Sequence, residues 1–221
     1  SIFCQDTSQI EVVLVDDGSP DGTYEVAKTY AEKHANLRVF HKDNEGVGAA
    51  RNFLLEQAVG EFIWFVDSDD YIVNKSLQQI LSELNNMIDM LGISYNGVNI
   101  LPFESSGIEY IKRGHINGYL WTKIIRRSVI EDANIRFDPK RYSQEDWFFL
   151  MQVYPLLKGI KQIPLQAYIY SDDNENSVMR GIHVENTKRN VADSRVTICN
   201  FKTYIDCHRY HTFYEYYRQW L

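Results

Sequence analysis

The chain has 221 residues, of which 44% are hydrophobic and 14% aromatic, enough to bury the core of one large domain. Its net charge of −7 argues against general binding to nucleic acids, and its apolar runs are far shorter than the roughly 20 residues that span a bilayer. The three cysteines are scattered without a Cys-x-x-Cys pair, so neither a disulfide framework nor a zinc site is favoured. We therefore expect a globular protein of the cytoplasm.

The first part of the chain alternates short apolar strands with amphipathic helices. The predicted order is strand, helix, strand, helix, strand, at residues 10–15, 23–34, 37–40, 48–59 and 61–66. This alternation is typical of an α/β fold with a mostly parallel, Rossmann-like sheet flanked by helices. The spacing of the first helix predicts a buried face made of Val26, Ala27, Tyr30 and Ala31.

The second part of the chain is less regular. A helix is predicted at 77–91 and a strand within 91–100. Further on we expect a helix near Glu109, a turn at 137–142, a helix at 144–157 and a strand near 165–170.

Two acidic clusters follow predicted strands. Asp16 and Asp17 come directly after the first strand, and Asp67, Asp69 and Asp70 come after the third. In open parallel sheets, ligands bind at the carboxyl ends of the strands. The alternatives are an acidic turn that caps the next helix for the first cluster, and a helix N-cap for the second.

The second cluster is typical of a metal site. Three aspartates within four residues repel one another unless a positive charge offsets them. Carboxylate oxygens suit Mg²⁺ or Mn²⁺, and these ions usually take one or two protein carboxylates together with substrate phosphates. Asp67 and Asp69, in D-x-D spacing, can supply that pair of ligands.

Several motifs resemble those of a known family. The segments "VLVDDGSPDGT", "KDNEGVGAARN", "GEFIWFVDSDD", "SQEDWFF" and "YIYSDDNENSVMR" look like successive motifs of inverting family 2 glycosyltransferases of the GT-A fold, the bacterial kind that builds surface polysaccharides. The resemblance covers roughly residues 9 to 181. It implies one GT-A domain over residues 1–183.

The resemblance implies roles for particular residues. In that family the first acidic pair helps to read the nucleotide base, usually uracil, the D-x-D segment binds ribose and metal, and the "ED" carboxylate is the catalytic base. Carried onto this chain, the base-reading and ribose-binding positions are Asp16, Asp17, Ser19, Asp67 and Ser68. The metal ligands would be Asp67 and Asp69, and the catalytic pair Glu145 and Asp146.

The chemistry of the "ED" pair makes sense without the resemblance. Inverting transfer needs a base for the acceptor hydroxyl, and an ordinary Asp with a pKa of about 3.9 is already ionised at neutral pH. Neighbouring residues of a helix project about 100° apart, so we expect Asp146 to face the acceptor and Glu145 to point elsewhere. The alternative is ordinary acidity in the first turn of a helix.

Four weaker candidates surround these motifs. Arg51 is expected either to pair with the nucleotide or to form a surface ion pair. Trp121 is expected either to form a wall of the acceptor site or to pack in the core, and Lys123 to approach the diphosphate. His183 is a further candidate metal ligand, although a lone histidine is more often structural.

The chain also departs from the family pattern. The family's opening strand and Pro-x-Tyr-Asn turn are not found, so we expect an open place beside the strand at 10–15. No Arg-Trp dipeptide of the processive synthases occurs, so we expect transfer of one sugar. Residues 184–221 are rich in aromatic side chains and are predicted to form a helical extension. We expect this extension either to contact a membrane surface at the inner face or to pack against the body of the protein or against a second copy in a homodimer.

The combined interpretation is a metal-dependent inverting glycosyltransferase. It would move one sugar from a UDP-linked donor to a saccharide or lipid-linked acceptor in cell-surface polysaccharide synthesis. The alternatives are a sugar-nucleotidyltransferase, which usually carries a Gly-rich basic loop, and a catalytically silent module that binds nucleotide sugars.

Overall fold

The structure is a computed structural model that describes residues 1–141 and 144–171. The predicted extension at 184–221 and His183 lie outside the described residues. Among the described helices, none combines the length and the hydropathy that a membrane span requires.

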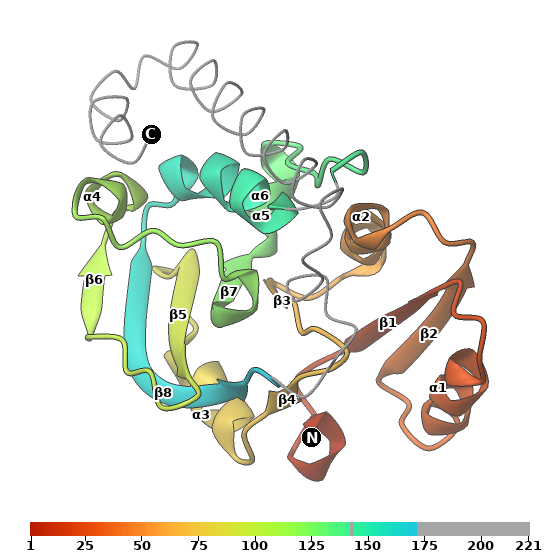
Figure 1. The fold of residues 1–221 in the computed structure, drawn as a ribbon. Helices are drawn as coiled ribbons and strands as arrows, with labels where there is room; N and C mark the ends of the chain where they lie inside the picture. The colour runs from red at the N-terminus through yellow and green to blue at the C-terminus, as the bar shows by residue number, and fades with distance from the viewer. Residues whose placement is uncertain (142–143, 172–221) are drawn as a thin grey trace.

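A small parallel sheet forms the first unit. Strand β1 (Val12–Asp17) pairs in parallel with β2 (Leu37–Lys42), with Val12 opposite Leu37, and helix α1 (Thr23–Ala31) connects them. Figure 1 shows this unit beside the larger sheet. The predicted buried face of α1 is largely wrong, because Val26 is 60% and Tyr30 53% exposed and only Ala27 is buried. Two strands offer too little apolar surface to cover the whole helix face.

The larger sheet has six strands. Their order is β3-β7-β5-β8-β4, with β6 also pairing with β8. The strands are β3 (Phe62–Trp64), β4 (Tyr71–Ile72), β5 (Met90–Tyr95), β6 (Phe103–Ser105), β7 (Lys123–Arg126) and β8 (Ile160–Ile169). Strands β5 and β8 run parallel, and the remaining ladders of this sheet are antiparallel. The predicted α/β class is confirmed.

Helices cover both faces of the larger sheet (Figure 1). They are α3 (Ser76–Glu83), α4 (Gly107–Lys112), α5 (Arg127–Asp132) and α6 (Glu145–Val153), whereas α2 (Val47–Gln57) packs mainly on β1 of the small sheet. Met90 of β5 packs in a core cluster with α4 and α6, whereas the next residue, Leu91, packs in a second cluster with Ile80 of α3. This alternation is the two-residue period of a strand buried on both sides.

Three predicted boundaries in the second half need correction. The helix expected at 77–91 ends at Glu83, and Asn85 then accepts a hydrogen bond from the Met87 amide in a turn that competes with the helix. The helix expected at 144–157 ends at Val153, where a 3₁₀ turn with Pro155 near its start follows. The strand expected near 165–170 begins earlier, at Ile160 of β8. Pro164 does not interrupt this strand, because it lies at an irregularity of the β5–β8 ladder, where a strand can contain a proline.

Candidate functional site

Arg51 joins the two motifs that carry the predicted chemistry. It lies on α2 and is only 8% exposed. Its Nη1 donates to Glu145 Oε1 at 2.9 Å and to the Asp146 carboxylate, while its Nη2 donates to Asp67 Oδ1 at 3.0 Å. The guanidinium also lies over the Phe137 ring. The D-x-D loop after β3 and the start of α6 are therefore held together by one side chain.

The charges in this cluster are unbalanced. Three carboxylates surround one guanidinium. Burial opposes the charged form of Arg51, but Asp146, Asp67 and Glu145 outweigh it and raise the pKa of the guanidinium. Burial, with the charges of Glu145 and Asp67, raises the pKa of Asp146 from 3.8 to about 7, although Arg51 opposes this shift. The site therefore has an excess of negative charge, which a cationic ligand would relieve.

The expectation that Glu145 points away from Asp146 is wrong. Both carboxylates reach the same Nη1 atom of Arg51. Glu145 is the first residue of α6 and follows Gln144, which has a φ of 57°. The side chain of Glu145 is one methylene longer than that of Asp146. The longer side chain can turn back toward the cation in spite of the 100° helical step.

The three aspartates after β3 have different environments. Ser68 and Asp69 are exposed, whereas Asp70 is buried. Asp70 accepts hydrogen bonds from the Tyr168 hydroxyl at 2.6 Å and from the Ser171 amide at 2.7 Å, and its burial raises its pKa. The same Tyr168 oxygen accepts from the Asp67 amide at 3.1 Å. Asp70 and Tyr168 thus fix the loop that presents Asp67 and Asp69.

We expect Tyr168→Phe to lower the free energy of unfolding by about 1–3 kcal/mol, because the buried Asp70 carboxylate and the Asp67 amide each lose a hydrogen-bond partner. Urea denaturation measures this change. Tyr30→Phe, at a half-exposed tyrosine on α1, is the control and should change little. Equal stabilities of the two variants would contradict the role given to Tyr168.

The donor set fits a hydrated cation. Asp67 and Asp69 offer carboxylate oxygens on a partly exposed loop. In residues 1–141 and 144–171, no group of three or more His, Cys, Asp or Glu side chains is arranged to hold a metal by itself. Mg²⁺ and Mn²⁺ that keep several waters need only one or two such carboxylates, with substrate phosphates completing the shell. The residues present therefore suit this kind of site and not a closed protein cage.

The first acidic cluster is held from the neighbouring strand. Asp16, only 3% exposed, lies opposite His41 in the β1–β2 register, and its Oδ2 is 2.6 Å from His41 Nδ1. Its Oδ1 accepts from the Ser19 amide. Hydrogen bonding by Ser19, and then by His41, holds the pKa of Asp16 below its ordinary value, although burial opposes this effect. Asp16 is therefore a fixed anion at the end of β1.

Asp17 ties the end of β1 to the loop before α2. One of its oxygens accepts from Lys42 Nζ at 2.7 Å and from the Glu45 amide, and the other accepts from the Gly46 amide at 2.9 Å. Gly18 follows with φ +75°, and a Cβ there would lie 2.7 Å from the Asn44 nitrogen, so only glycine fits. These contacts lie at the loop before α2 and not at the start of α1, so they do not support the alternative in which this cluster caps the next helix. A role of Asp17 in reading the base stays a prediction.

Trp121 and Lys123 are both buried. Trp121 stacks on Tyr168 with ring centroids 4.7 Å apart, and its carbonyl accepts from Trp64 Nε1. Lys123 is 2% exposed, with its Nζ hydrogen-bonded to Asn117 Oδ1 and Thr122 Oγ1, and burial lowers its pKa to about 7. Of the two alternatives for Trp121, the structure therefore shows packing in the core. Contacts of Trp121 with an acceptor and of Lys123 with a diphosphate stay predictions.

Sequence reasoning missed two residues of the site. Tyr168 lies on β8, 101 residues from Asp67, and although it begins the quoted YIYSDDNENSVMR segment, the sequence assigned it no role in the site. His41 could have been found from the parallel pairing of the first two strands, because the register places it opposite Asp16.

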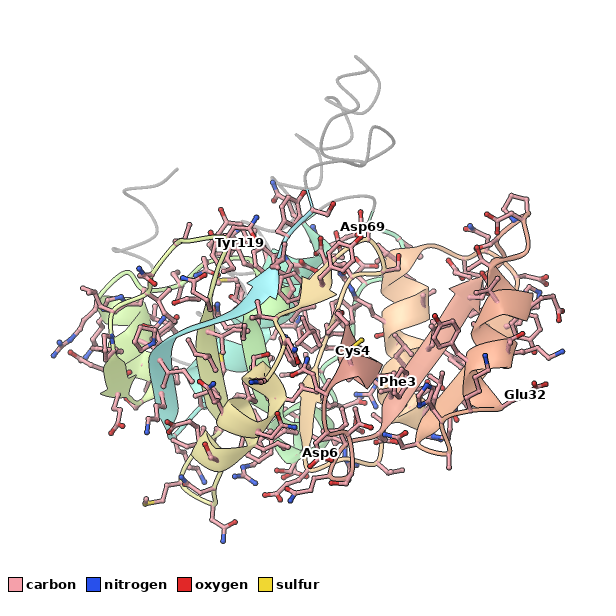
Figure 2. All side chains as sticks on the ribbon, turned by 90° about the horizontal axis from the view of Figure 1, so that it is seen from below. Phe3, Cys4, Asp6, Glu32, Asp69 and Tyr119 are labelled. Atoms are coloured by element: carbon pink, nitrogen blue, oxygen red, sulfur yellow. The ribbon has the colours of Figure 1, made fainter. Side chains whose placement is uncertain are left out.

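Figure 2 shows Asp69 on the same edge of the molecule as Tyr119 and on the opposite edge from Asp6. Tyr119 stacks on Trp121, so an aromatic cluster lies next to the D-x-D loop.

Comparisons with known proteins give the family. The model of "Glycosyl transferase family 2" matches residues 1–131. The uncharacterised glycosyltransferase EpsJ of Bacillus subtilis is 31% identical over 196 residues, which cover 80% of this chain and 57% of EpsJ. The poly(ribitol-phosphate) β-N-acetylglucosaminyltransferase TarS of Staphylococcus aureus is 33% identical over 187 residues, which cover 80% of this chain and 32% of TarS.

The fold leads to the same family. The crystal structure of TarS residues 1–349 in complex with UDP-GlcNAc matches with a TM-score of 0.68 at 30% identity, over 81% of this chain and 54% of that one. This match confirms the GT-A fold that the motifs implied. The chain spans little more than half the length of EpsJ and about a third of the length of TarS. With the family model over more than half of its residues, the chain belongs to glycosyl transferase family 2.

Proposed function

We propose that this chain binds a UDP-linked sugar together with Mg²⁺ or Mn²⁺ and transfers one sugar, with inversion, to a hydroxyl of a saccharide or lipid-linked acceptor. The acceptor would belong to the synthesis of a cell-surface polysaccharide, as the motif resemblance implies. Solved relatives of about 30% identity are complexes with UDP and with UDP-GlcNAc, which favours a uridine nucleotide here.

The observation that carries the proposal is the shared contact of Arg51. The D-x-D carboxylate Asp67 and the "ED" carboxylates meet at one guanidinium, although about 80 residues of chain separate the two motifs. A donor whose diphosphate lies at the D-x-D loop would thus have its reacting carbon near the catalytic pair. Proximity of this kind lowers the barrier because the reacting groups are already oriented.

Asp146 is the proposed general base. Its ionised carboxylate would accept the acceptor hydroxyl proton as the new glycosidic bond forms on the face opposite the leaving diphosphate. Asp67 and Asp69 would hold the divalent ion. When bound, that ion would neutralise the charge that develops on the leaving diphosphate. Arg51 would orient Asp146 and hold the D-x-D loop against the same site.

A thermal-shift panel tests the nucleotide assignment. UDP, GDP, CMP and dTDP are compared with and without Mn²⁺, and UDP with Mn²⁺ should raise the melting temperature most. A ligand present at about 100 times its Kd adds roughly 2.7 kcal/mol of stability. A larger shift with another nucleotide, or the same shift without the ion, would contradict the uridine or the metal assignment, respectively.

We expect Asp69→Ala to abolish the part of the UDP-induced stabilisation that depends on Mn²⁺, because one of two protein ligands to the ion is lost. The same thermal-shift measurement detects this change. Glu32→Ala removes an exposed carboxylate from a distant part of the surface (Figure 2) and should keep the full effect. If Asp69→Ala keeps metal-dependent stabilisation, Asp69 is not a ligand.

The raised pKa of Asp146 predicts a pH dependence of transfer. Below a pH of about 7 the carboxyl of the free enzyme is protonated and cannot accept a proton, so kcat/KM should fall about tenfold per pH unit. Glu145→Gln removes a neighbouring negative charge that raises this pKa, so it should move the fall to lower pH. If kcat/KM of the wild type falls only near pH 4, Asp146 titrates like an ordinary aspartate and the prediction is wrong.

A further inference from the structure

Four tyrosine rings surround Trp121. Tyr119 and Tyr170 stack on it with ring centroids 5.4 Å and 5.6 Å away. Tyr168 stacks on it at 4.7 Å, and Tyr95 packs at right angles to it at 4.6 Å. We call these five residues the aromatic cluster. Trp121 and Tyr168 are buried, whereas Tyr119 is 48% exposed, so its ring is the part of the cluster that most faces the solvent.

The aromatic cluster touches both halves of the proposed active site. The Tyr168 hydroxyl accepts from the Asp67 amide, which places the cluster against the D-x-D loop. On the other side, a Cβ at Gly118 would lie 2.4 Å from the ring of Trp147, the residue that directly follows the proposed base. Tyr119 therefore lies between the donor loop and the base, where an acceptor hydroxyl has to arrive.

Hydrogen bonds fix the backbone on both sides of Tyr119. Asn117 Oδ1 accepts from the Tyr119 amide and from Lys123 Nζ, both at 3.1 Å. The Tyr119 carbonyl accepts from Thr122 Oγ1 at 2.8 Å, and the Asn117 carbonyl accepts from the buried Tyr154 hydroxyl at 2.8 Å. A ring presented by a backbone that is already ordered loses little freedom when a ligand binds, which favours binding.

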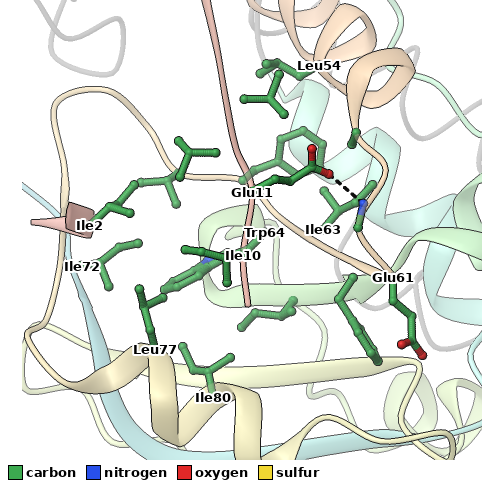
Figure 3. A pocket seen from close by; sticks show the side chains of 18 of the residues that line it. Ile2, Ile10, Glu11, Leu54, Glu61, Ile63, Trp64, Ile72, Leu77 and Ile80 are labelled. Carbon is green, nitrogen blue, oxygen red and sulfur yellow. Dashed lines mark hydrogen bonds between the residues drawn. The ribbon is translucent and has the colours of Figure 1, made fainter. Parts of the chain in front are cut away.

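Trp64 of β3 supports the cluster from behind. Its indole N–H donates to the Trp121 carbonyl at 2.7 Å, and its ring centroid lies 6.2 Å from that of Tyr168. Figure 3 shows Trp64 at a cavity of about 830 Å³ beside β1, at the open place that the family pattern predicts there. Of the described residues that line this cavity, none belongs to the aromatic cluster, so the two features are distinct.

We propose that the exposed ring of Tyr119 forms a subsite for a pyranose ring of the acceptor, a proposal that rests on the proposed function of sugar transfer. The C–H groups on one face of a pyranose carry a partial positive charge and pack against the negative face of an aromatic ring. An open-chain polyol has no flat apolar face of this kind. The acceptor would therefore end in a cyclic sugar and not in a polyol.

A lipid surface also attracts exposed aromatic rings. Figure 2 shows the exposed Asp69 on the same edge of the molecule as Tyr119, and its carboxylate would repel the anionic lipids of a membrane. One half-exposed ring also offers little apolar area for insertion. These observations favour the saccharide over the lipid.

Ligand-observed NMR titration of the 221-residue chain, without nucleotide, tests the subsite. The ligands are the methyl β-glycosides of glucose, galactose and N-acetylglucosamine, with sorbitol as the open-chain comparison. At least one glycoside should bind in a saturable way, about fivefold more tightly than sorbitol. Tyr119→Leu keeps an apolar side chain without a ring and should weaken this binding about fivefold, whereas Tyr119→Phe keeps the ring and should stay within about twofold of the wild type.

Tyr30→Leu, at a half-exposed tyrosine on α1, is the matched control and should leave glycoside binding unchanged. Equal binding by the wild type and Tyr119→Leu, or no preference for any glycoside over sorbitol, would overturn the subsite. Binding to phosphatidylglycerol vesicles that Tyr119→Leu loses, while it keeps glycoside binding, would also overturn it, because the ring would then meet lipid.

The thermal shift with UDP and Mn²⁺, measured on the same variants, separates this proposal from the proposed function. Equal shifts in the wild type and Tyr119→Leu, together with weaker glycoside binding by the variant, would confine the role of Tyr119 to the acceptor. No shift in any variant would contradict the proposed function, whereas the glycoside titration would still decide for or against the saccharide subsite.

Discussion

Asp146→Asn should lower the rate of sugar transfer by about 10²–10⁴-fold and leave the affinity for UDP nearly unchanged. Asparagine keeps the size and polarity of the side chain but cannot take the hydroxyl proton. The lost interaction belongs to the transition state and not to nucleotide binding, so kcat should fall without a matching rise in Kd. Single-turnover kinetics and calorimetry of UDP binding measure the two quantities separately.

Glu145→Gln is the companion variant. Because Glu145 and Asp146 meet the same Arg51 nitrogen, it is not an inert control. It keeps the general base and should therefore retain far more activity than Asp146→Asn, with its pH profile shifted to lower pH. If Glu145→Gln abolishes transfer and Asp146→Asn leaves it normal, the base is Glu145.

Arg51→Met should have the largest effect on stability, lowering the free energy of unfolding by about 3–5 kcal/mol. The substitution keeps an apolar stem of similar length but leaves the carboxylates of Asp67, Glu145 and Asp146 crowded without their cation. Urea denaturation at neutral pH measures the loss. It should shrink at acid pH, where Asp146 becomes protonated and the repulsion falls.

Two further arginine variants distinguish this cluster from an ordinary ion pair. Arg113→Met removes an exposed partner of Glu109 and should change stability little. Arg51→Lys keeps the charge but cannot reach two carboxylate groups with a planar fork. Its free energy of unfolding should therefore lie between those of the wild type and Arg51→Met. If Arg51→Met is as stable as Arg113→Met, the cluster does not hold the two motifs together.

The sequence predicted the parts of the site that depend on local pattern. Strand ends, acidic clusters and the start of α6 were recognisable because each combines an apolar run with polar residues at fixed spacing. The predicted strand at 61–66 and the aspartates after it match β3 and its loop, and the helix expected from Gln144 begins at Glu145. These features depend on residues close to one another in the chain.

Contacts between distant segments could not be predicted in the same way. Arg51 was expected at a nucleotide or in a surface ion pair, but it is buried against carboxylates 94 and 95 residues further along. Asp70 looked like a third member of the acidic cluster, and only the fold shows that Tyr168, 98 residues away, holds it inward. Burial and partners of this kind are decided by packing.

Proton NMR of the first product formed from UDP-GlcNAc and Mn²⁺ tests the proposed reaction most directly, with water or a saccharide as the acceptor. The donor sugar is α-linked, so inverting transfer predicts UDP and a β-configured sugar, with the rate reduced at least a hundredfold in Asp146→Asn. An α-configured first product, or release of UTP from UDP-GlcNAc and pyrophosphate, would contradict inverting glycosyl transfer by this site.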